Sequence, residues 1–368
     1  MSQYLKISCL FIAILLIGIS CKKDPGPSEP MEQEVDLTKA REDIAKNISN
    51  NFILPEFATL NELAKTFNAS TTSFSAESNE ANLLQLRNDL KALRIQWQHV
   101  AIFNIGPSFD HVLAGSINTY PLDQNKIESN ISNADFIFGR IDNKDAEGYQ
   151  AIAYLIHNEN ALDQLLGDPN RLDYLVNLTI HTTDLIDNVY QAWEGSSYLA
   201  GFISADQNGT DVGSAIGVLI NAMDVYLQRF FRDGKVGIPA GVRSAGITRP
   251  TATEAHFAMY DKTLFLAALN QIEQVLEGSN GNESSGESLL SYLEKLGHQE
   301  LSALIRNQLN LIETETTLVN ENFSLQIEED NQKMIDLFLS IQDLVGLIKS
   351  DMATMMGIKI TNLDVDGD

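Results

Sequence analysis

Apolar residues recur at intervals of three and four along most of the chain after Val35, which is the pattern of amphipathic α-helices. No segment shows with any strength the alternation of apolar and polar residues that predicts a β-strand. We therefore expect an all-α fold made of two helical bundles packed together. A Gly-rich stretch that begins at Gly201 separates the two expected domains, which cover residues 35–200 and 201–368.

Start and stop signals place several of the helices. A helix over 79–104 is ended by "IGP" at 105–107, and a helix over 167–195 begins with Asp168 as its N-cap and Pro169 in its first turn. Pro55 predicts a kink or break in the first helical stretch, because proline cannot donate a backbone hydrogen bond. The second half is expected to contain helices over 215–234, 251–278, 287–314 and 331–357, with an irregular segment at 235–250.

The first 20 residues have the pattern of an export signal. A short segment with one positive charge precedes an apolar run over 9–19, which is too short to span a membrane and is typical of a signal peptide. Small residues lead directly to Cys21, so we predict that residues 1–20 are removed and that a lipid on Cys21 anchors the protein to a membrane. The alternative is an ordinary signal peptide followed by an incidental cysteine. Residues 21–34, rich in Pro and charge, are expected to form a flexible tether.

The opening "CKKD" of the expected mature chain resembles the start of many lipoproteins from the Bacteroidota. This resemblance implies an outer-membrane lipoprotein on the periplasmic or the cell-surface face. Cys9 lies in the predicted signal peptide and Cys21 is predicted to be acylated. We therefore expect no disulfide and no thiol nucleophile in the mature protein.

Charge narrows the range of partners. Fifty acidic residues against 25 basic ones give a formal net charge of −25. Such an acidic chain is not expected to bind nucleic acid or an anionic membrane surface. The acidic residues are spread along the chain, which favours a role in solubility over the collection of cations.

The segment "GYQAIAYLIHNEN", residues 148–160, raises the question of a metal site. A His and a Glu three residues apart on a helix share one face and form half of a metal site. Here Gln150 and Ala153 stand three apart, and His157 follows one turn later. The segment is a metal-binding helix, the remains of one, or only a packed helix. No Gly-x-Ser-x-Gly, His-Glu-x-x-His or phosphate-loop motif occurs, so the usual hydrolase and nucleotide functions have no support.

Several segments together resemble the imelysin family, exported all-helical proteins that are often lipoproteins. The resemblance covers residues 35–368. It is carried by "QWQHVAIFNIGP" (96–107), "INTYPLDQNKIE" (117–128), "EGYQAIAYLI" (147–156), "LDYLVNLT" (172–179), "KVGIPAGVRS" (235–244) and "GIKITNLDVDGD" (357–368). It implies two helical domains with a functional cleft between them. It also implies the metallopeptidase activity proposed for the family, or the link to iron uptake of other members.

The family's hallmark is Gly-x-His-x-x-Glu on a helix, and this chain departs from it. Gly148 matches the glycine, but Gln150 stands at the His position and Ala153 at the Glu position. A neutral amide is a poor ligand for a transition metal, and a methyl group is neither a ligand nor a general base. We therefore expect no catalytic residue, no cofactor and no metal here. His157 is a weak metal candidate, because it needs ligands from another segment.

Large or polar residues in the family-like segments are the candidates for the lining of the cleft. Aromatic side chains offer a flat binding surface, and an arginine can hold a carboxylate by two hydrogen bonds. For Trp97 and Tyr154, packing between helices is the alternative. The candidates are Trp97, Tyr120, Asp123, Gly148, Gln150, Tyr154 and Arg243.

These observations lead to one main hypothesis about function. We expect a non-enzymatic, lipid-anchored binding or accessory protein of the cell envelope, which by family resemblance acts in iron or other nutrient acquisition. Its expected partners are the membrane at Cys21, a small-molecule or iron-related ligand, and an envelope protein. The alternatives are a metallopeptidase, or a structural adaptor that binds a partner protein in the cleft.

Overall fold

A computed structural model of the protein describes residues 36–134, 136–195, 197–205, 209–281 and 286–361. The predicted signal peptide, Cys21 and the predicted tether lie outside the described residues, as do residues 362–368 at the C-terminal end.

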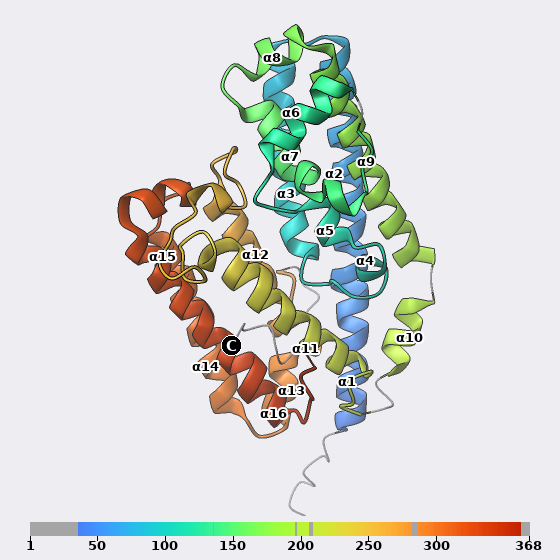
Figure 1. The fold of residues 1–368 in the computed structure, drawn as a ribbon. Helices are drawn as coiled ribbons and strands as arrows, with labels where there is room; N and C mark the ends of the chain where they lie inside the picture. Colours follow the sequence, from blue (N-terminus) through green and yellow to red (C-terminus); the bar gives the residue numbers. More distant parts are fainter. Residues whose placement is uncertain (1–35, 135, 196, 206–208, 282–285, 362–368) are drawn as a thin grey trace, which may run out of the picture. The chain divides into compact units, whose positions relative to one another are not determined.

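The chain from Asp36 onward is one compact unit built from helices (Figure 1), and its described residues contain no β-strand. The expected all-α fold is confirmed. The α-helices are α1 (Leu37–Asn47), α2 (Leu54–Ala76), α3 (Glu80–Val100), α4 (Gly106–Asp110), α5 (Leu113–Ile117), α6 (Gln124–Asn133), α7 (Gly148–His157), α8 (Ala161–Gly167), α9 (Pro169–Gly195), α10 (Tyr198–Ser204), α11 (Ala215–Val225), α12 (Asp261–Glu277), α13 (Leu289–Lys295), α14 (Gln299–Thr317), α15 (Phe323–Gly346) and α16 (Ala353–Met355). Short 3-10 and π-helical segments join some of them: η1 (Ile48–Ile53), η2 (Ile141–Ala146), η4 (Tyr226–Gly237), η5 (Pro250–Ala252) and η6 (Leu347–Met352).

Two sets of helices make up this unit. Helix α2 packs along both α3 and α9, while α15 packs against η4 and α14 (Figure 1). The sets meet where α12 contacts α3 and where α1 contacts α11 and α13. One hydrophobic core includes residues from both halves of the chain. The division into two domains near residue 200 stays a prediction.

Local signals set several helix ends as expected. The Asn79 side chain caps α3 by accepting a hydrogen bond from the Asn82 N–H at 2.9 Å. The Asp168 carboxylate likewise accepts from the Asn170 N–H at 3.0 Å at the start of α9, which ends at Gly195. At Pro55 the chain stays helical, because the π-helical segment η1 comes directly before it and all the residues at the junction keep helical dihedral angles. The predicted interruption is a change of helix type rather than a break.

Two of the expected helices in the second half are wrong in their bounds. The helix predicted over 251–278 begins at Asp261, because the Asp261 carboxylate accepts the backbone N–H groups of Ala255 (2.6 Å) and Phe323 (3.3 Å). These bonds hold residues 253–260 in turns against the start of α15. The helix predicted over 287–314 is two helices, because Gly297 takes a left-handed conformation (φ 90°) between them.

The other two second-half helices agree better with the sequence. α11 and η4 together cover the helix expected over 215–234. α15 starts earlier than residue 331 but is interrupted at Asp330 (φ −156°, ψ 82°), next to the predicted start. Within the described residues, no helix has the length and apolar character needed to cross a membrane.

Candidate functional site

The helix α7 carries the imelysin-like motif and lies inside the unit, with every residue from Gly148 to Ile156 buried. Gly148 opens it with a left-handed backbone (φ 76°), and a Cβ atom at this position would lie 2.5 Å from the Ile117 carbonyl oxygen. Both facts require glycine, because other residues rarely adopt this conformation and none fits the space. The motif's glycine therefore has a structural role in this chain.

The two ligand positions of the motif are occupied by neutral side chains. The Gln150 amide donates a hydrogen bond to the Thr253 carbonyl oxygen at 2.9 Å, and Ala153 is fully buried in the core. These residues do not fit a metal ion, since one is a buried amide bonded to the backbone and the other offers no donor atom. Among the described residues, no group of three or more His, Cys, Asp and Glu side chains is arranged to hold a metal ion.

His157 ends α7 in a positively charged environment. Burial, together with the nearby Arg87 and Arg94 guanidinium groups, lowers its pKa to about 4. Its Nε2 atom is buried without a hydrogen-bond partner in the described part of the chain. A metal cation at this position would face the same two positive charges.

The segment that Gln150 contacts at Thr253 also carries the buried carboxylate of Glu254. Its Oε2 atom forms an ion pair with the buried ammonium group of Lys235, which η4 supplies. Its Oε1 atom accepts from the Gln98 amide at 2.8 Å and from the Asn118 amide at 2.9 Å. Lys235 also donates to the Gln98 side-chain oxygen at 2.8 Å. Each charge in the pair is thus stabilised by further hydrogen bonds, as a buried ion pair requires.

Arg94 adds a second cation from α3 and is itself fully buried. Its guanidinium group donates to the Glu254 backbone carbonyl and lies over the Tyr260 ring, 5.3 Å from the ring centre. Four segments that are distant in the sequence therefore converge on one polar centre: α3, the C-terminal end of α5, η4 and residues 253–261. The polar centre consists of Arg94, Gln98, Asn118, Lys235 and Glu254.

The carboxylates of this region differ in their proton affinity. Burial by itself would raise the pKa of Glu254, but the Lys235 ammonium and the Arg94 guanidinium outweigh it, so the pKa is lowered and the side chain is ionised. Burial lowers the pKa of Lys235, and Glu254 opposes that shift. At Asp261 burial is the largest effect, and it raises the pKa to about 6 in spite of two backbone hydrogen bonds and the Arg94 charge, which lower it.

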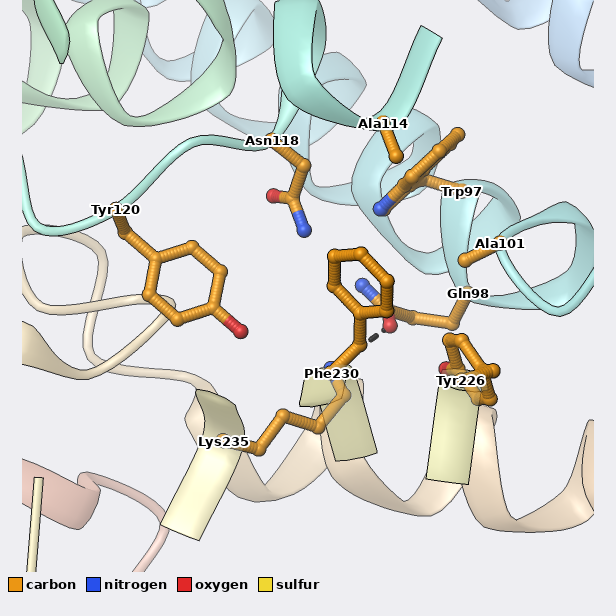
Figure 2. Close-up of a pocket in the computed structure, with 9 residues that line it drawn as sticks. All are labelled: Trp97, Gln98, Ala101, Ala114, Asn118, Tyr120, Tyr226, Phe230 and Lys235. Carbon is orange, nitrogen blue, oxygen red and sulfur yellow. Dashed lines mark hydrogen bonds between the residues drawn. The ribbon is translucent and has the colours of Figure 1, made fainter. Parts of the chain in front are cut away.

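A small cavity opens beside the polar centre (Figure 2). Its volume is about 20 Å³, which is room for about one water molecule. In Figure 2 the side chains of α3, of α5 and of the residues that follow α5 face those of η4 across the cavity, and the Phe230 ring points into the space between them. Burial raises the pKa of both Tyr120 and Tyr226, so their hydroxyl groups stay protonated and can donate hydrogen bonds. The lining residues are Trp97, Gln98, Ala101, Ala114, Asn118, Tyr120, Tyr226, Phe230 and Lys235.

The residues proposed from the sequence occupy different places. Trp97 and Tyr120 lie together in the wall of the cavity (Figure 2). Tyr154, from α7, instead donates to the Glu128 carboxylate at 2.6 Å, and this carboxylate also pairs with Arg171. These contacts make Tyr154 part of the packing between α6, α7 and α9.

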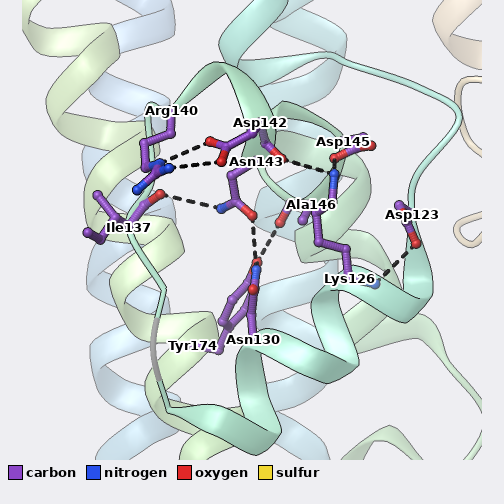
Figure 3. A network of polar contacts seen from close by, with 10 residues as sticks. All are labelled: Asp123, Lys126, Asn130, Ile137, Arg140, Asp142, Asn143, Asp145, Ala146 and Tyr174. Atoms are coloured by element: carbon purple, nitrogen blue, oxygen red, sulfur yellow. Dashed lines mark hydrogen bonds and ion pairs between the residues drawn. The ribbon is translucent and has the colours of Figure 1, made fainter.

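The charged side chains of Asp123 and Arg243 are both engaged by nearby residues of the chain itself. The Asp123 carboxylate caps α6 by accepting from the Lys126 N–H at 3.1 Å, at the edge of a polar network (Figure 3). Arg243 pairs with the Asp233 carboxylate at 3.1 Å and lies over the Phe338 ring. The carboxylate expected at Arg243 is therefore supplied by the chain itself.

Sequence reasoning missed most of the polar centre, although part of it left a signal. Arg94 comes four residues after Leu90 and three before Trp97, so it stands on the apolar face of its own helix. A charged residue at such a position must find a buried partner. Lys235 opens a segment that carries the family resemblance, whereas the neighbours of Glu254, which include Thr253 and His256, do not mark it as buried.

Comparison with known proteins agrees with this fold. The family model described as Imelysin, Peptidase_M75, matches residues 53–350. A crystal structure of a protein described as an iron-regulated protein A precursor, from Parabacteroides distasonis, is similar with a TM-score of 0.70 at 16% identity, over 85% of this chain and 95% of that one. An imelysin-like protein from Psychrobacter arcticum is similar with a TM-score of 0.69 at 13% identity, over 88% of this chain and 98% of that one. No curated protein matches the chain.

Proposed function

The chain belongs to the imelysin family, and from this premise we propose that it is a non-enzymatic, lipid-anchored binding or accessory protein of the cell envelope. Its proposed role is in iron or other nutrient acquisition. One observation carries the proposal: the motif helix keeps its glycine and its buried position, while Gln150 and Ala153 take the places of the two metal-binding side chains.

A binding role has support from the cavity beside the polar centre. Small-molecule sites are concave, mostly apolar, and supplied with a few polar groups held in fixed positions. Here Trp97 and Tyr120 supply apolar surface, and Lys235 is held by Glu254 and Gln98. We propose this cavity as the polar end of a ligand site, since its volume of about 20 Å³ admits only a single polar group. The iron context is supported by the name of the similar Parabacteroides distasonis protein, which is described as iron-regulated.

The metallopeptidase alternative requires a metal ligand and a general base that the motif positions lack. A helix with Gln150 and Ala153 at these positions supplies neither. The adaptor alternative, in which a partner protein binds in the cleft, differs from the proposal only in the size of the ligand.

The metal content of the purified protein tests the proposal. We expect inductively coupled plasma mass spectrometry to find no stoichiometric iron or zinc in the natural protein. The Gln150→His/Ala153→Glu variant restores the family's ligands, and Gln150→Asn/Ala153→Gln serves as a control that changes the same positions without them. One equivalent of tightly held metal in the natural protein, lost on changing Gln150 or His157, would overturn the proposal.

The proposed anchor and physiological role need tests in cells. A Cys21→Ser variant is expected to lose labelling by a palmitate analogue and to leave the membrane fraction. A deletion strain is expected to grow poorly when iron is chelated, with recovery by the natural gene and less recovery by Cys21→Ser. Normal growth of the deletion strain under limitation of iron and of other nutrients would contradict the role in acquisition.

A further inference from the structure

An apolar groove lies next to the cavity, between α4 and α11. Its volume is about 400 Å³, within the range of sites for small organic ligands. Three of its apolar side chains are exposed: Phe109 by 65%, Val212 by 40% and Phe230 by 37%. Exposed apolar side chains that gather around a hollow indicate a binding site. The lining residues are Asn104, Ile105, Phe109, Val212, Val218, Asn221, Ala222, Val225, Tyr226, Arg229 and Phe230.

The groove is continuous with the polar cavity. Tyr226 and Phe230, both on η4, line the groove and the cavity at once. Figure 2 shows the Phe230 ring between the Asn118 side chain and η4, so this ring stands at the junction of the two spaces. A ligand in the groove would therefore reach the polar cavity by displacing one aromatic side chain.

The Tyr226 hydroxyl group, at this junction, is a buried hydrogen-bond donor without an acceptor among the described residues. The Tyr226 side chain is only 3% exposed, and its hydroxyl group makes no hydrogen bond within the described part of the chain. Leaving a buried hydroxyl group unpaired is unfavourable, and an acceptor oxygen on a ligand would remove that cost. The Tyr120 hydroxyl group and the Lys235 ammonium group face the same space (Figure 2).

The charged side chains that line the two spaces are both cations, and one of them, Lys235, is paired with the buried Glu254 carboxylate. Lys235 lines the cavity and Arg229 lines the groove, while neither lining contains an Asp or a Glu. This is unusual in a chain with 50 acidic and 25 basic residues. Arg229 is exposed, and its guanidinium group makes no ion pair with any described residue. The combination of donors, cations and apolar walls is suited to an anion with an apolar body.

We propose that the groove and the cavity form one site for a small carboxylic acid with an apolar body. The body lies between α4 and α11, and a carboxylate oxygen accepts the hydrogen bond of the Tyr226 hydroxyl group. Phe230 turns aside to admit this oxygen, and Arg229 attracts the anion at the rim. The inference rests on the proposed binding function and names the class of ligand.

Isothermal titration calorimetry of the full chain with octanoate tests the inference, with octan-1-ol and octylamine as probes of equal length. We expect octanoate to bind at least tenfold more tightly than octan-1-ol, and octylamine not to bind. An Ala222→Phe variant fills the groove and is expected to abolish binding. Tyr226→Phe removes the donor and is expected to weaken binding about tenfold, since a hydrogen bond to a charged group contributes about 1.5 kcal/mol or more.

Controls separate this site from a general attraction of anions. Arg229→Gln is expected to weaken octanoate binding severalfold, whereas Arg249→Gln, which removes the same charge from an exposed position outside both linings, is expected to leave it unchanged. Equal binding of octylamine, or binding that survives Ala222→Phe in a protein with unchanged circular dichroism, would overturn the inference. No binding of octanoate would also overturn it, but the proposed function would stand if the metal and growth tests still gave their expected results.

Discussion

The helix α7 and the π-helical segment η4 both serve the interior of the protein, but they differ in chemistry. α7 is regular, neutral at its buried motif positions, and tied to its neighbours by a glycine contact and by the bond from Gln150 to Thr253. η4 has widened helical turns and brings the charged Lys235 into the core against Glu254. π-Helical turns are rare and occur often at functional sites. The segment named by the family motif is thus the scaffold, and the charges lie on segments that the motif does not include.

This difference teaches that a motif can keep its packing after its chemistry has changed. Gly148 is required by a backbone contact whatever stands at position 150. Lys235 and Glu254, in contrast, depend on each other, because either one alone is an uncompensated buried charge. Substitutions in the two regions should therefore have different sizes.

Lys235→Met should have the largest effect. It leaves the buried Glu254 carboxylate without its ammonium partner, and we expect a loss of about 3–5 kcal/mol in the free energy of unfolding. Urea unfolding measures the change. The Lys235→Met/Glu254→Gln double variant should recover most of the stability, because it removes both charges. A single variant that costs less than about 1 kcal/mol would show that the pair is not needed for the fold.

Gly148→Ala should cause the second-largest loss in the free energy of unfolding. The added Cβ atom meets the Ile117 carbonyl oxygen and the left-handed backbone is strained, so we expect a loss of about 2 kcal/mol in the free energy of unfolding. Gly346→Ala is the matched control, because Gly346 has helical dihedral angles and open space around it. That variant should gain about 0.5–1 kcal/mol. Equal effects of the two variants would refute the structural role of Gly148.

Gln150→Leu should have an intermediate effect. It removes the hydrogen bond to the buried Thr253 carbonyl oxygen, and we expect a loss of about 1–2 kcal/mol in the free energy of unfolding, measured in urea. Metal content and ligand binding should stay the same. A change in metal content on this substitution would mean that α7 is more than a scaffold.

Substitution of His157 should have the smallest effect on the free energy of unfolding, and this effect should depend on pH. Its folded pKa of about 4 lies below the value of 6.5 for the unfolded chain, so the unfolded state binds the proton more readily. The stability that this difference contributes is present above pH 6.5 and is lost as the pH falls towards 4. We expect His157→Gln to reduce the loss of stability between pH 7 and pH 5 by about 1 kcal/mol, given that the ring is partly exposed. Urea unfolding at both pH values measures it, and an unchanged pH dependence would exclude this role.

The sequence predicts those features that depend on neighbouring residues. The bounds of α3 and α9 follow from caps such as Asn79 and Asp168, which act within one turn. The predicted start of α12 at residue 251 is wrong, because the Asp261 carboxylate accepts a hydrogen bond from the Phe323 N–H, 62 residues further along the chain. No local pattern contains that bond.

The candidate site shows the same limit. Trp97 and Tyr120, chosen for the cleft by residue type, lie together in the cavity wall, and their role in ligand binding stays a prediction. Glu254 was not expected, since nothing in a single sequence tells which of 50 acidic residues is buried. Its burial depends on Lys235 and on amides more than 130 residues away, which only the tertiary fold brings near.

These separations also bear on the order of folding. Glu254 bonds to Gln98 across 156 residues and to Asn118 across 136, so the polar centre cannot form from either half of the chain alone. Contacts between distant residues require closure of long loops and form slowly. Until they form, burial of Lys235 or Glu254 is unfavourable, and the half-folded chain keeps these charges in water. Burial of the pair therefore requires both halves of the chain, because its two charges come from the second half and its two amide partners from the first.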